Sequence, residues 1–121
     1  MRSLHAFAAG VEIVTGVALI ATPSLIAQLL FGAELSGVAV PLARLAGVGL
    51  LSLGIACRPT KVAAPAAELG ILVYNALVAL LLIVVGVEGE WVGALLWPAV
   101  ALHVVLTALL ARARLRAAES A

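Results

Sequence analysis

The sequence predicts an all-α fold: a single integral membrane domain over residues 1–121, built as a four-helix bundle with a short interfacial helix between spans 1 and 2. Composition is the first reason. Hydrophobic residues make up 65% of the chain and charged residues 11%, against roughly 45–50% and about 25% in an ordinary soluble domain. So few charges cannot cover that much apolar surface in water, and we expect lipid to cover it.

Four apolar stretches are the second reason, because a helix needs about 20 such residues to cross the hydrocarbon core. They cover residues 4–22, 38–57, 66–87 and 91–111. Pro23, Pro41 and Pro65 lie near their starts or ends, where a missing N–H costs little. Pro98 lies inside the last stretch, where we expect it to kink the helix. Glu12 interrupts the first stretch, which disfavours a cleaved secretory signal.

The placement of charge is the third reason. With four crossings, all basic residues except Arg44 fall on one side of the membrane: Arg2, Arg58, Lys61, Arg112, Arg114 and Arg116. The charged residues in the connections on the other side are all acidic: Glu34, Glu88 and Glu90. Basic loops stay in the cytoplasm. We therefore expect a multi-pass protein of a bacterial inner membrane with both termini cytoplasmic.

The first connection is itself apolar. Leu25, Ile26, Leu29 and Leu30 share one helical face, and Gly32 is a plausible C-cap. This pattern predicts a short helix lying in the outer interface. The alternative is that the segment extends the first or second span.

Five polar side chains inside the spans are the candidate ligand- or proton-binding residues: Glu12, Arg44, Tyr74, Asn75 and His103. Polar groups in hydrocarbon are costly and usually face the bundle interior. At 1.5 Å per residue, Glu12, Asn75 and His103 each lie about 12–13 Å from the cytoplasmic edge. We expect them to form one polar layer. The plainer interpretation is a structural layer that only holds the helices together.

Arg44 and Tyr74 fit this layer less directly. Arg44 lies about 20 Å from the cytoplasmic edge. We expect it to face inward with Gly47 and Gly54, although a direct pair with Glu12 needs tilt or a water molecule. Tyr74 points about 100° away from Asn75, which favours a position facing lipid or another subunit.

The sequence lacks residues that several classes of protein function require. A single cysteine, no aspartate and two histidines exclude an intrachain disulfide and disfavour aspartate-dependent catalysis and metal sites. No phosphate-binding loop or nucleic-acid-binding patch is present. His5 and His103 differ in depth by roughly 10 Å, so they cannot readily clasp one haem iron. The sequence does not indicate which cofactor, if any, the protein binds.

Three segments resemble a known group: Gly-Val-Glu-Ile-Val-Thr-Gly at 10–16, Arg-Leu-Ala-Gly at 44–47 and Leu-Trp-Pro-Ala-Val-Ala-Leu-His at 96–103. They look like the small four-helix bacterial proteins related to the DoxX-like group. That resemblance implies a membrane partner of redox or stress-response enzymes. Small multidrug resistance transporters are similar in length and carry a Glu in the first span, but only Glu12 matches and Arg44 would repel cationic drugs.

These observations predict a non-enzymatic inner-membrane module: an accessory subunit, or a bundle that binds a small ligand, lipid or quinone at Glu12, Asn75 and His103. One alternative is a small proton-coupled transporter that uses Glu12. Another is a redox-associated protein in which His103, Glu12 and Tyr74 line a pocket for quinone or haem. Membrane lipids, other membrane subunits or a second copy are the expected partners, and nucleic acid is not.

Overall fold

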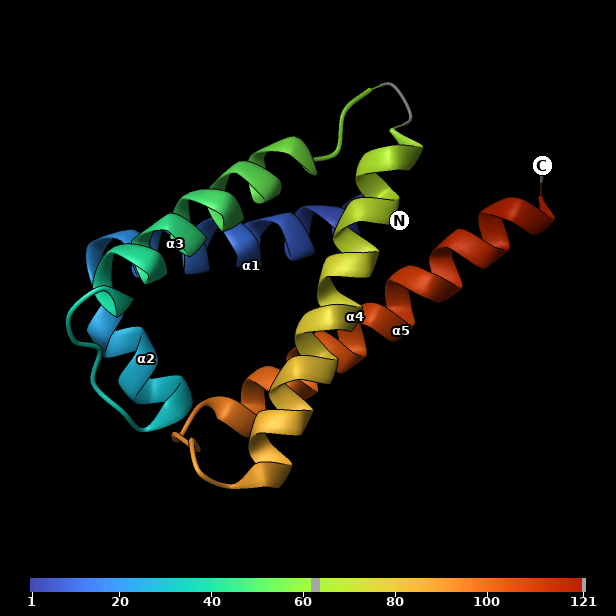
Figure 1. The fold of residues 1–121 in the computed structure, drawn as a ribbon. Helices are drawn as coiled ribbons and strands as arrows, with labels where there is room; N and C mark the ends of the chain where they lie inside the picture. The colour runs from blue at the N-terminus through green and yellow to red at the C-terminus, as the bar shows by residue number, and fades with distance from the viewer. Residues whose placement is uncertain (62–63, 121) are drawn as a thin grey trace.

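The computed structural model describes residues 1–61 and 64–120, and all of its regular structure in that part is helical (Figure 1). The five helices are α1 (Arg2–Ala21), α2 (Pro23–Phe31), α3 (Ala39–Ala56), α4 (Pro65–Glu88) and α5 (Leu96–Glu119). All except α2 are long and apolar enough to cross a membrane. The predicted all-α fold with four spans is confirmed, and the chain is a multi-pass membrane protein.

The last span begins later than predicted. Residues 91–95 are not helical, α5 starts at Leu96, and it continues past residue 111 to Glu119. Pro98 is consequently the third residue of the helix, within the first turn, where N–H groups have no helical acceptor. It breaks no helical hydrogen bond, and the reason for expecting a kink there disappears.

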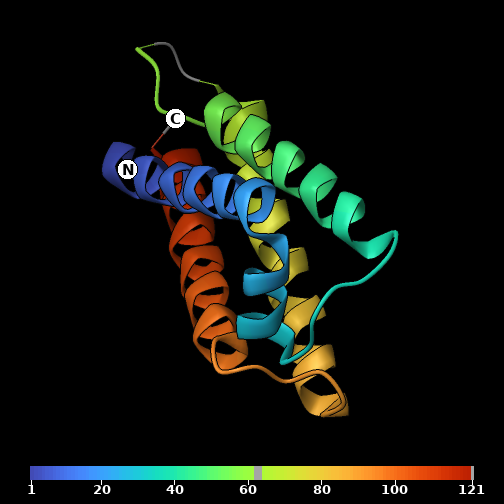
Figure 2. The same cartoon turned by 90° about the vertical axis from the view of Figure 1, so that its left-hand side faces the viewer.

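The long helices form two antiparallel pairs, α1 with α3 and α4 with α5, and the pairs cross at an angle (Figure 1). Figure 2 shows both termini and the α3–α4 connection at one end of the molecule. We call this the basic end, because Arg2, Arg58, Lys61 and the three arginines of the tail lie there. The helix α2 and the other two connections lie at the opposite end, with Glu34, Glu88 and Glu90.

Glycines allow the α1–α3 pair to pack at backbone distance. A Cβ atom on Gly47 would lie 2.7 Å from the Gly16 carbonyl oxygen, and one on Gly54 would lie 2.7 Å from the Ala9 carbonyl oxygen. Helices in lipid associate through close contacts of this kind, because lipid tails are as apolar as the side chains. The interface between α1 and α3 therefore has no room for larger side chains at these positions.

The short helix α2 ties the two pairs together at the acidic end. It ends at Gly32 in the left-handed conformation (φ +69°), so the predicted helix and its cap are confirmed. The carbonyl oxygens of Leu29 and Leu30 accept hydrogen bonds from the N–H groups of Leu95 and Gly93, at 2.8 and 2.9 Å. A Cβ atom on Gly93 would collide with the Leu29 carbonyl. The carbonyl groups that the end of α2 leaves without helical partners thus bind the connection between α4 and α5.

A second contact between the pairs lies where they cross near the basic end. Its core is formed by small residues of α1 and larger aliphatic ones of α4 and α5, with one cysteine: Ala8, Ala9, Cys57, Ile71, Leu106 and Leu110. Elsewhere the spans are largely bare, since only 11–28% of the residues in their most apolar windows are buried. The exposed faces carry side chains such as Phe7, Leu45, Leu77 and Leu80. Lipid or other membrane segments must cover them.

We predict that Gly47→Ala lowers the unfolding free energy by about 1–3 kcal/mol, because the added methyl group overpacks the α1–α3 interface. Gly49→Ala is the matched control on the same helix: a Cβ there meets nothing within 4 Å. Thermal unfolding in mild detergent, followed through the exposure of the buried Cys57 thiol, measures both. Equal stability of the two variants would contradict the close contact.

Candidate functional site: a polar layer where the helix pairs cross

Asn75 of α4 and His103 of α5 form the best-defined part of the layer. The Asn75 amide nitrogen donates to the Ile71 carbonyl oxygen at 2.8 Å, and Asn75 Oδ1 lies 2.8 Å from His103 Nδ1. The Asn75 side chain is completely buried. Because Oδ1 can only accept, Nδ1 of His103 must carry the proton that it donates. In the neutral ring, Nε2 is then left as an acceptor.

Tyr74 links this pair to α1. Its ring makes an edge contact with His103, with ring centroids 6.3 Å apart and an interplanar angle of 76°. Its hydroxyl group interacts with the carboxyl group of Glu12. The expectation that Tyr74 faces lipid or another subunit is wrong. Because α1 and α5 both pack against α4, two adjoining faces of α4 are covered, one at Asn75 and one at Tyr74.

Glu12 is the most unusual member of the layer. Only 1% of its surface is exposed, yet its Oε1 atom has no hydrogen-bond partner in the described part of the chain. It does not contact Asn75 or His103 through a hydrogen bond, and Tyr74 provides the connection instead. The three residues expected at one depth thus belong to one cluster, in which Tyr74 lies between Glu12 and His103.

Arg44 lies outside the cluster. The structure leaves its side chain exposed, and it forms no ion pair with Glu12 in the residues described. The expectation of an inward-facing Arg44 is wrong for two reasons. The α1–α3 interface is closed by Gly16 and Gly47, and α4 and α5 pack mainly against α1 and meet α3 near its C-terminal end, at Leu53 and Cys57. Nothing therefore covers the Arg44 position from the second pair.

The chemistry of the layer is that of a hydrogen-bonding site. It offers a carboxyl oxygen without a partner, a phenol hydroxyl and an imidazole nitrogen, from Glu12, Tyr74 and His103. No three His, Cys, Asp or Glu side chains of the described residues gather as metal ligands would. The depth of the polar residues could be calculated from the sequence, but the link through Tyr74 could not, because it depends on the crossing angle of the pairs.

No family model, curated protein or solved structure matches the chain. The resemblance to the DoxX-like group therefore stays a prediction from residues.

A double-mutant cycle tests the Asn75–His103 bond. We expect Asn75→Leu and His103→Leu each to cost about 1–3 kcal/mol of unfolding free energy, because each leaves a buried partner unsatisfied. The double variant should cost less than the sum of the two, since it leaves neither partner behind. Urea or SDS unfolding in mixed micelles measures these values, with Ser52→Ala on the exposed face of α3 as the control. Strict additivity would show that the two side chains do not interact.

Proposed function

We propose that this chain is a non-enzymatic module of a bacterial inner membrane that binds the polar head of a small lipid-soluble ligand of quinone or quinol chemistry in the layer of Glu12, Tyr74 and His103. One observation carries the proposal: the buried Oε1 atom of Glu12 has no hydrogen-bond partner in the described part of the chain. A layer that served only to hold the helices together would not need a buried oxygen atom without a hydrogen bond.

The energetic argument concerns the cost of that atom. A buried carboxyl oxygen without a hydrogen bond costs free energy, and no contact among the described residues offsets that cost at Glu12 Oε1. Asn75 and His103, by contrast, satisfy each other through a 2.8 Å bond. A donor from a bound molecule would satisfy Glu12 without disturbing that bond.

Quinols supply complementary groups. The hydroxyl groups of a quinol can donate to Glu12 Oε1 and to the free Nε2 of His103. The ring and its apolar tail need a route from the lipid phase. The two helix pairs touch chiefly where they cross and at α2, and most residues of the spans are not buried, so we expect the ligand to approach from the lipid between the pairs.

We predict that lipid extracts of the protein purified in mild detergent contain such a ligand and that Glu12→Leu lowers its ratio to protein at least about tenfold, equivalent to 1.4 kcal/mol. Tyr74→Phe keeps the ring and removes only the hydroxyl, so it should lower the ratio while preserving the fold. Glu34→Leu removes a carboxyl group at the acidic end and is the control. Mass spectrometry of the extracts measures the ratio. A ligand-free wild type, or equal ratios in all variants, would refute the proposal.

The same proposal places the basic end in the cytoplasm. The structure groups the basic residues of the chain ends and of the α3–α4 connection on one side, and basic loops of inner-membrane proteins face the cytoplasm.

Cysteine labelling tests this orientation in a Cys57→Ser background. Glu34→Cys should react with a membrane-impermeant maleimide in intact cells, because Glu34 is exposed at the acidic end. Glu119→Cys should react only after the membrane is permeabilised. Labelling of Glu119→Cys in intact cells would contradict the orientation.

A further inference from the structure

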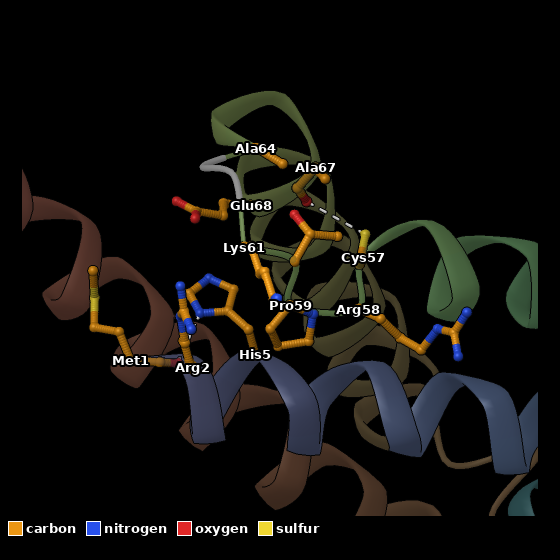
Figure 3. Close-up of a pocket in the computed structure, with 11 residues that line it drawn as sticks. Met1, Arg2, His5, Cys57, Arg58, Pro59, Lys61, Ala64, Ala67 and Glu68 are labelled. Carbon is orange, nitrogen blue, oxygen red and sulfur yellow. Dashed lines mark hydrogen bonds between the residues drawn. The ribbon is translucent and has the colours of Figure 1, made fainter.

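A cavity of about 360 Å³ opens at the basic end, between the start of α1, the α3–α4 connection and the start of α4 (Figure 3). It is distinct from the polar layer and shares no residue with it. Its lining includes three cationic side chains and one carboxylate, from Arg2, Arg58, Lys61 and Glu68. Ligand pockets in proteins typically have volumes of about 300–1,000 Å³, so this cavity is large enough for a headgroup.

The side chains that converge on the cavity are Arg2, His5 and Lys61, whereas the guanidinium group of Arg58 points away from them (Figure 3). His5 is buried, and its Nδ1 lies 3.0 Å from the Met1 carbonyl oxygen. Neither Arg2 nor Lys61 forms an ion pair or hydrogen bond within the described residues. The cavity therefore presents two cations without an anionic partner, with Glu68 as the one acidic group of the lining.

The position of the cavity decides between possible anions. It lies where the spanning helices end, at the level of lipid headgroups. Two apolar side chains next to lining residues are exposed: Ile55, close to Cys57, is 48% exposed, and Leu69, beside Glu68, is 44% exposed. Exposed apolar side chains this close to the cavity in sequence offer a surface to acyl chains, which a free anion would not use.

We propose that this cavity binds the phosphate group of an anionic membrane phospholipid, with Arg2 and Lys61 as the main contacts. Guanidinium and ammonium groups are the usual protein partners of phosphate oxygens. Basic pockets between transmembrane helices on the cytoplasmic side suit anionic lipid headgroups. Binding there would join the start of α1 to the residues that follow α3 at the basic end.

The test uses the full chain reconstituted in vesicles of equal parts phosphatidylcholine and phosphatidylglycerol, then extracted in mild detergent for native mass spectrometry. The wild type should retain one phosphatidylglycerol molecule and no phosphatidylcholine. The double variant Arg2→Gln/Lys61→Gln should retain it about tenfold less. Arg112→Gln/Arg116→Gln has the same loss of charge at the same end, outside this cavity, and should retain the lipid like the wild type.

Three further outcomes are decisive. Equal retention by the wild type and the cavity variant would overturn the site, and equal loss in both double variants would show diffuse attraction in its place. Inorganic phosphate added at the extraction step distinguishes the source: if it displaces the lipid at millimolar concentration, the site is one for free phosphate and the proposal is wrong. Circular dichroism confirms folding, and Arg2→Lys/Lys61→Arg should restore lipid retention.

Discussion

The hydrogen bond between His103 and Asn75 fixes the interior of this bundle. The amide of Asn75 is oriented by the Ile71 carbonyl of its own helix, so that only its oxygen can face α5. That orientation sets the proton on Nδ1 of His103 and leaves Nε2 without a hydrogen bond among the described residues. Tyr74 then lies at the edge of the imidazole ring, and Glu12 lies beyond it. This one bond therefore determines which imidazole nitrogen is left free to accept.

Two kinds of contact surround the layer: backbone contacts within the first helix pair and side-chain contacts between the two pairs. Within the first pair, Gly16, Gly47 and Gly54 allow backbone contact between α1 and α3, which excludes larger groups such as Arg44 from that interface. Between the pairs, side chains of α1, α4 and α5 meet only at the crossing. A buried carboxyl group at such a joint has few neighbours to satisfy it. In our proposal, a ligand supplies the hydrogen-bond donor that Glu12 Oε1 lacks.

Much of the fold could be predicted from the sequence, because apolar length, basic residues and the Gly32 cap act locally. The start of the last span could not be predicted in this way. Trp91 and Val92 are as apolar as a helix requires, but the N–H groups of Gly93 and Leu95 donate hydrogen bonds to carbonyl oxygens of α2, and this contact between distant segments keeps residues 91–95 out of the helix. The depth of Glu12, Asn75 and His103 depends only on helix rise, whereas the placement of Tyr74 and Arg44 depends on which helix covers which face.

The proton on His103 is the point at which this account can be tested most directly. Nitrogen-15 NMR of histidine-labelled protein in lipid distinguishes a protonated from an unprotonated ring nitrogen, and His5→Gln assigns the remaining signal to His103. Our account predicts a neutral ring with the proton on Nδ1 and an Nε2 signal that shifts when a quinol is added. A ring protonated on Nε2 alone, or an Nε2 signal that no ligand perturbs, would contradict it.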